Sequence, residues 1–138
     1  MRTFDEVHEQ PLETDEQVLE RVQELLRNGI RQQLWLMFLD GADRQLPLLM
    51  PTDIPRRPGQ RDATDLARFI HGIIDEIDAT SVVATIERRG SDTIGDDDRE
   101  WFRLVRDACE MAEVKLRGPL LCHANGVRWV AAEDYVMG

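Results

Sequence analysis

Two carboxylate side chains, Glu87 and Asp98, flank the most polar turn of the sequence. The apolar run SVVATIE ends in Glu87, and the loop SDTIGDDD ends in Asp98. Oxygen ligands of this kind suit Mg²⁺ or Mn²⁺, and two carboxylates can also serve as a hydrolytic acid and base. Because Arg88 and Arg89 directly follow Glu87, we expect these arginines to neutralise it as ion partners instead.

Five arginines form a second candidate site. A guanidinium group binds phosphate or carboxylate through paired N–H donors, so several of them around one pocket would bind a small anion. Arginines spread over separate faces would contact only solvent, and this is the default interpretation. The candidates are Arg56, Arg57 and Arg61 in a proline-rich connection, and Arg88 and Arg89 after the apolar run.

The other reactive side chains are predicted to be structural. Asp96 and Asp97 precede Asp98 in what should be the first turn of a helix, where acidic groups interact favourably with the helix dipole. Cys109 and Cys122 lack the spacing of metal ligands, so we expect two reduced, buried thiols.

Hydrophobic periodicity predicts eight elements in the order α-β-β-α-β-α-β-β. A single-domain α/β fold follows, with a mixed sheet flanked by helices. Pro47 places the second strand at an edge or a bulge, and Trp101 should anchor the core. Helices are expected from Thr14 to Gly29, from Asp62 or Thr64 to Ile77 and over 97–113, and strands over 33–39, 45–50, 80–87, 115–123 and 127–130.

Length and charge limit the classes of function. With 138 residues, we expect one α/β domain over 14–138, preceded by a flexible acidic tail over 1–13. The net charge of −10 argues against binding to duplex nucleic acid. The apolar runs are too short for a membrane span, and the first residues lack the apolar segment of a secretory signal, so we expect a cytoplasmic protein.

The order of elements and the central strand-loop-helix resemble the JAB/MPN metalloprotease family, most closely its bacterial RadC-like branch, over about residues 14–131. The family's metal motif is H-x-H-x7-S-x2-D. Aligned without gaps, its four positions fall on Thr85, Glu87, Gly95 and Asp98, and only Asp98 matches.

The resemblance implies a degenerate site. Catalytic zinc needs three protein ligands, and a threonine hydroxyl is a poor one because it stays neutral. We therefore expect no catalytic residues, no bound metal and no cofactor, and we favour a protein that is not an enzyme.

Three functions follow as hypotheses. The leading one is a catalytically silent JAB/MPN-like domain that serves as an interaction or scaffold module, either as a homo-oligomer or with another protein. The alternative is a binder of a small anionic ligand through the clustered arginines. The third keeps an enzyme, with Glu87 and Asp98 as a residual hydrolytic pair.

Overall fold

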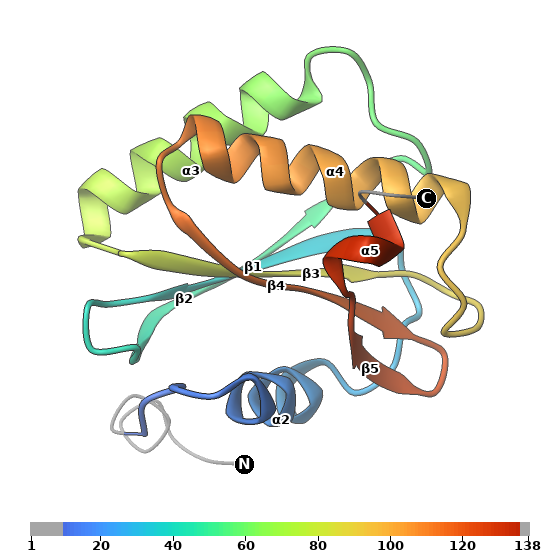
Figure 1. Cartoon of the computed structure of the whole chain (residues 1–138), viewed down its shortest axis with the longest axis horizontal. Helices are drawn as coiled ribbons and strands as arrows, with labels where there is room; N and C mark the ends of the chain where they lie inside the picture. The colour runs from blue at the N-terminus through green and yellow to red at the C-terminus, as the bar shows by residue number, and fades with distance from the viewer. Residues whose placement is uncertain (1–9, 136–138) are drawn as a thin grey trace.

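The structure, a computed structural model, describes residues 10–135 and shows a single small α/β domain (Figure 1). The predicted element order is confirmed, and a short C-terminal helix is added to it. The elements are α2 (Asp15–Leu26), β1 (Gln33–Leu39), β2 (Gln45–Asp53), α3 (Asp62–Ile77), β3 (Ser81–Glu87), α4 (Asp96–Met111), β4 (Lys115–His123), β5 (Gly126–Trp129) and α5 (Ala132–Tyr135).

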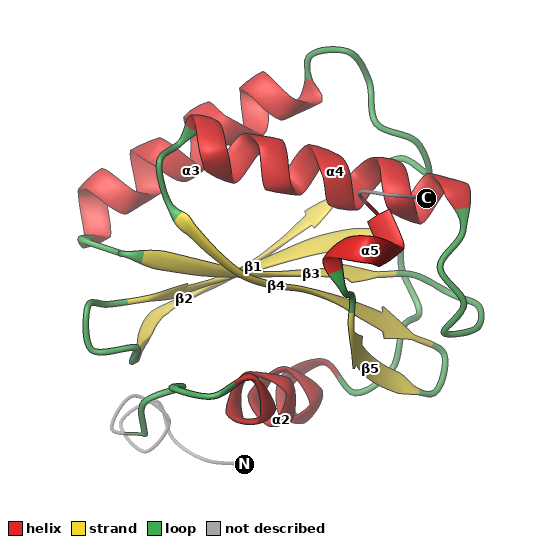
Figure 2. Cartoon of the chain, in the orientation of Figure 1, coloured by secondary structure: helices red, strands yellow, loops and turns green. Residues whose placement is uncertain are grey.

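The five strands form one mixed sheet in the order β2-β1-β3-β4-β5. Only β3 and β4 are parallel neighbours, and the long connection between them contains α4. Helices α3, α4 and α5 lie on one face of the sheet, and α2 lies on the other (Figures 1 and 2). The central strand β3 is buried along its whole length, as expected for a continuous apolar run covered on both faces.

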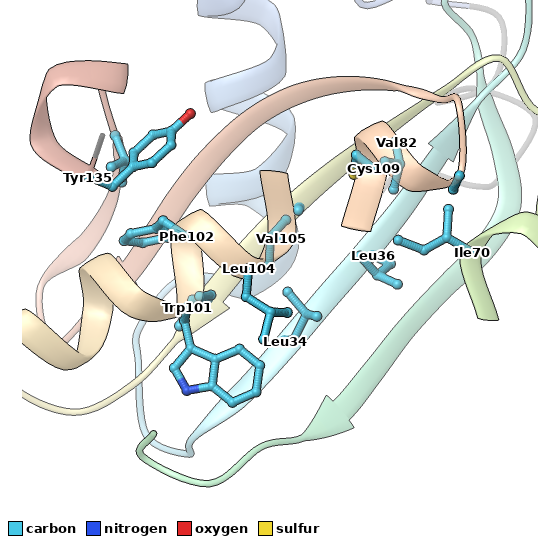
Figure 3. Close-up of a cluster of buried hydrophobic side chains, with 14 of the residues drawn as sticks. Leu34, Leu36, Ile70, Val82, Trp101, Phe102, Leu104, Val105, Cys109 and Tyr135 are labelled. Carbon is cyan, nitrogen blue, oxygen red and sulfur yellow. The ribbon is translucent and has the colours of Figure 1, made fainter. Parts of the chain in front are cut away.

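Each face of the sheet has its own apolar cluster. Val82, Ala84 and Ile86 of β3 belong to the cluster beneath α3 and α4, whereas Val83 belongs to the cluster beneath α2. This alternation is the normal period of a strand. Trp101 is buried in the first cluster beside Leu34 and Leu104, so its prediction as a core residue is confirmed (Figure 3).

Strand β2 lies at one edge of the sheet, as Pro47 predicted, and its pairing with β1 is irregular between Gln45 and Leu49. A second proline, Pro51, lies nearer the end of the strand. The N–H of Ile54 donates to the carbonyl of Gln32. Successive residues of a strand point their N–H groups to opposite sides, and Pro51 lies three positions before Ile54, so its nitrogen faces away from β1. A proline nitrogen carries no hydrogen, so β2 has no donor on its outer side at this position.

Helix α2 begins as predicted but ends earlier. Thr14 and Gln17 form the expected capping box. The helix ends at Leu26, and Arg27 caps it with a φ of 62°, so the prediction that Gly29 ends the helix is wrong. Gly29 has a different role, because a Cβ there would overlap the carbonyl oxygens of Arg88 and Cys122.

The predicted tail joins the packed domain before Thr14. Leu12 is buried in the cluster beneath α2, and its N–H donates to the carbonyl of Asp43 over 2.8 Å. Arg117 donates in turn to the carbonyl of Leu12, also over 2.8 Å. The boundary drawn at Thr14 is therefore too late, because one apolar side chain and two hydrogen bonds hold the chain at Leu12. Residues 1–9 of the predicted tail lie outside the described residues.

We expect Leu12→Ala to lower the free energy of unfolding by about 2–3 kcal/mol, because it removes a buried side chain and leaves a cavity. Urea denaturation measures the loss. Glu13→Ala is the control, since Glu13 is exposed and it is its backbone N–H that donates to the side chain of Gln17. Equal stability of the two variants would show that the chain before Thr14 does not belong to the core.

No helix within residues 10–135 is both long and apolar enough to span a bilayer.

Candidate functional site

A pocket of about 510 Å³ opens where β3 ends and α4 begins. Both elements bring polar groups to it, because the loop 88–95 joins the carboxyl end of a buried strand to a helix N-terminus. We call it the β3–α4 pocket. It is lined by Arg56, Arg88, Arg89, Asp96, Asp97 and Asp98, together with Ile30, Gln32 and Gly95.

Glu87 does not line this pocket, although it ends β3. Its side chain is buried, and one carboxylate oxygen accepts from the backbone N–H groups of Ile30 (2.9 Å) and Arg31 (3.0 Å). The other oxygen accepts from the indole N–H of Trp35 over 2.9 Å. Glu87 therefore fastens the connection between α2 and β1, and its carboxylate is satisfied by neutral donors.

The expectation that arginines neutralise Glu87 is wrong. Arg88 instead forms a two-pronged ion pair with Asp98, in which its Nε and one terminal nitrogen each lie 2.8 Å from a carboxylate oxygen. The physical reason is strand alternation, which turns consecutive residues to opposite faces. Arg89 donates to the carbonyl of Ile30 over 3.0 Å.

Arg88 holds the whole loop together. Besides Asp98, its terminal nitrogens donate to the carbonyl oxygens of Arg89, Ser91 and Thr93 at 2.8–3.0 Å. All five N–H groups of the guanidinium thus have acceptors within the protein. Both charged side chains are largely buried, at 15% exposure for Arg88 and 9% for Asp98. Arg88 is therefore a structural cation and has no donor left for a ligand.

The structure brings three of the five candidate arginines to one pocket. Arg56 and Arg89 line it beside Arg88, while Arg57 lies just outside and pairs with Asp97 over 2.9 Å. Arg61 precedes α3 and does not line the pocket. The two arginines available to a ligand are therefore Arg56, whose side chain is 84% exposed, and Arg89.

Each aspartate of the pocket already has an arginine partner. Asp96 pairs with Arg99, Asp97 with Arg57 and, at 3.9 Å, with Arg56, and Asp98 with Arg88. Three arginines and three aspartates line the pocket, and Arg57 and Arg99 pair with two of those aspartates from outside it. The charges of the lining side chains therefore balance, in a chain whose net charge is −10.

The four positions of the metal motif do not meet. Thr85 is buried on the α2 face among Val22, Met37 and other apolar side chains. Gly95 and Asp98 do lie together, and the N–H of Gly95 donates to the Asp98 carboxylate over 2.9 Å. Among the residues described, no three His, Cys, Asp or Glu side chains are grouped so that they could hold a metal ion.

Both cysteines are buried and free, as predicted. Burial raises the pKa of Cys109 to about 12. Burial, together with the nearby charge of Glu87, raises the pKa of Cys122 to about 11. The two thiols are therefore protonated and weak nucleophiles at neutral pH.

These thiols make stability depend on alkaline pH. In the unfolded chain they lose protons from about pH 9 upward, whereas the folded thiols stay protonated until about pH 11. The unfolded state is thus favoured as pH rises, and stability should fall by up to about 1.4 kcal/mol per pH unit for each thiol.

Urea denaturation at several pH values between 9 and 11 measures this slope. The control is the double variant Cys109→Ala and Cys122→Ala, whose slope should be shallower because only other groups titrate. Parallel slopes for the two proteins would show that the folded thiols ionise normally.

Sequence reasoning missed Trp35 and the backbone of Ile30 and Arg31 as the partners of Glu87. It also missed Asp97 as the partner of Arg57. The pairing of β1 with β3 places Trp35 opposite Thr85, two residues from Glu87 and on the same face. An aromatic N–H in a neighbouring buried strand was the available signal, but its use needs the register of the two strands.

No protein-family model matches this chain, and no curated protein matches it. The resemblance to the JAB/MPN family therefore rests on the order of elements and on the motif positions alone.

Proposed function

We propose that this domain is a catalytically silent, RadC-like member of the JAB/MPN class that acts as a binding module. The order of elements and the position of the β3–α4 pocket support the relationship to that class. The module would act on a protein partner or on a second copy of the chain, and it would carry out no hydrolysis.

The observation that carries this proposal is the ion pair of Arg88 and Asp98. Asp98 is the one motif residue that the chain retains, and both of its oxygens accept from Arg88. A metal ion at Asp98 would have to displace a guanidinium that is also bonded to three loop carbonyls. Glu87 offers no substitute, because three N–H groups hold its carboxylate on the other side of the strand.

Elemental analysis of protein purified from zinc-supplemented medium tests the silent site. We expect far less than one zinc per chain, because zinc needs three ligands and the motif supplies one carboxylate already held by arginine. About one zinc per chain that is lost in an Asp98→Asn variant would overturn the proposal and restore a metal-dependent hydrolase.

A second candidate function is the binding of a small anion in the β3–α4 pocket. It is favoured by the convergence of Arg56 and Arg89 on one concavity in which each lining aspartate is already paired with an arginine. The N-terminus of the 16-residue helix α4 opens into the same pocket and adds a favourable dipole. A phosphate or a carboxylate has the geometry that paired guanidinium donors recognise.

Isothermal titration with inorganic phosphate and with citrate at low salt tests the anion pocket. Loss of one charge-assisted contact should weaken binding about tenfold, so we expect this effect from Arg89→Ala and from Arg56→Ala. Arg68→Ala is the matched control, because Arg68 is exposed on α3 and lies outside the pocket. Equal weakening by all three variants would mean that anions bind only through the general charge of the surface.

A further inference from the structure

A second hollow lies between the end of β2, helix α3 and the first turns of α4. We call it the β2–α3 groove, and its volume is about 300 Å³. Trp101 lines the groove, and its indole N–H donates to the carbonyls of Pro55 and Arg56, both over 3.0 Å. The apolar side chains of the groove are Leu34, Ile54, Pro55, Leu66, Phe69 and Trp101.

The groove leaves part of the α3 apolar stripe uncovered. Phe69 falls on the stripe that the sequence predicts to face the core, yet it is 41% exposed. Ile70, its neighbour on that stripe, is fully buried. Ile70 belongs to the cluster beneath α3 and α4, whereas Phe69 lines the groove beside the end of the edge strand β2. An exposed aromatic at the rim of an apolar hollow is typical of a docking surface.

The rim of the groove carries negative charge without compensation. Asp53, Asp62 and Asp65 all line it, and none forms an ion pair with a cation of residues 10–135. Asp53 accepts from the amide of Gln33, and Asp62 accepts from the N–H of Gly59. In the β3–α4 pocket, by contrast, every aspartate has an arginine partner. The groove thus presents an apolar floor beside three carboxylates that have no ion partner within residues 10–135.

The edge of β2 does not favour strand addition at this point. Pro51 lacks the outward N–H that an added strand would need, and Pro47 weakens the other end of β2. A partner must therefore bind through side chains placed in the groove. A helix with apolar side chains on one face and basic side chains beside them meets this requirement.

We propose that the β2–α3 groove docks a basic, amphipathic helical segment of a partner protein. Its apolar anchors would pack on Phe69, Leu66 and Ile54, and its lysines or arginines would pair with Asp53, Asp62 and Asp65. The inference rests on the proposed function of a binding module, and it assigns that module a face and a class of partner.

The test uses a synthetic probe, a helical peptide of about 14 leucine and lysine residues with leucines at i, i+3, i+4 and i+7. Fluorescence anisotropy measures its binding to the full chain, and the same peptide with glutamate in place of lysine is the charge control. We expect the basic peptide to bind and the acidic one to fail.

Substitutions in the groove locate the site. Phe69→Ala should weaken the basic peptide about tenfold, and Asp65→Lys should do so by a similar factor. The matched controls are Met111→Ala, an exposed apolar residue of α4 outside the groove, and Glu76→Lys, an exposed acid near the end of α3. Both controls should change the affinity by less than about twofold. Equal effects of groove and control variants, or no binding, would overturn the proposal.

Sedimentation velocity tests whether a second copy of the chain occupies the groove instead of a partner helix. A dimer that forms with rising concentration and is lost in Phe69→Ala would mean that a second copy covers the groove, which also overturns the proposal. The outcome is independent of the metal analysis: a chain that holds zinc and binds the peptide at the groove would refute the silent site alone. A zinc-free chain that ignores the peptide would refute the groove alone.

Discussion

Replacing Arg88 with alanine is expected to lower the free energy of unfolding by about 3–5 kcal/mol. The variant leaves the buried Asp98 carboxylate without its cation and three loop carbonyls without their donor. Removing one partner of a buried ion pair costs more than the pair itself contributes, because the remaining charge stays buried. Urea denaturation followed by far-ultraviolet circular dichroism measures the change.

Arg89→Ala is the matched control for this experiment. It removes the same charge one residue along the chain but breaks a single hydrogen bond, to the carbonyl of Ile30. We expect a loss of about 1 kcal/mol or less. Adding Asp98→Asn to Arg88→Ala should recover part of the large loss, since it removes the unpaired charge. Equal stability of the two single variants would contradict the central place given to the Arg88–Asp98 pair.

Glu87→Gln is expected to cost about 3 kcal/mol, although it keeps the size and shape of the side chain. The carboxylate of Glu87 accepts from three N–H groups and donates none. An amide has only one oxygen, so its NH₂ group must face either the indole of Trp35 or the two backbone donors. One N–H is then left buried without an acceptor. Thermal and urea denaturation both report the loss.

A second substitution separates this explanation from a simple loss of charge. Trp35→Phe removes the indole donor, so the glutamine amide of a Glu87→Gln, Trp35→Phe double variant no longer faces another N–H. We expect the double variant to be more stable than the sum of the two single losses by about 1 kcal/mol. Strict additivity would mean that Trp35 and Glu87 do not interact as described. Glu76→Gln, on the exposed side of α3, controls for the chemical change itself.

The elements of the fold follow from short-range patterns and were therefore predictable. Alternation and apolar runs locate β1 and β3, and the capping box at Thr14 locates the start of α2. Phe69 shows the limit of periodicity. A helical stripe indicates which residues can face the core, but it does not distinguish Ile70, which is buried, from Phe69, which is exposed beside the edge strand β2.

The partners in the candidate site were harder to predict, because they depend on register and on loop paths. Arg88 was assigned to Glu87 from adjacency in sequence, whereas the alternation of strand side chains separates the two. That error was avoidable from the sequence alone. The pairing of Arg57 with Asp97 could not be predicted from the sequence. The two residues are 40 positions apart with a proline-rich loop between them, and no periodic pattern relates their positions.

Leu12 was missed for a similar reason. The acidic residues around it predict a solvated segment, and a single apolar side chain makes no period that could be recognised. Its side chain is buried by the cluster beneath α2, and its backbone is held by Asp43 and Arg117, which lie in distant parts of the chain.

The close packing at Gly29 has a consequence for how the chain reaches its fold. The N–H of Gly29 donates to the carbonyl of His123 over 2.7 Å, and its Cα lies against the carbonyls of Arg88 and Cys122. These carbonyl groups lie at the ends of β3 and β4. The site into which Gly29 packs therefore forms only when those two strands have paired. Contacts so distant in sequence form slowly. During synthesis, the end of helix α2 can therefore be fixed in place only after β4 has been made and has paired with β3.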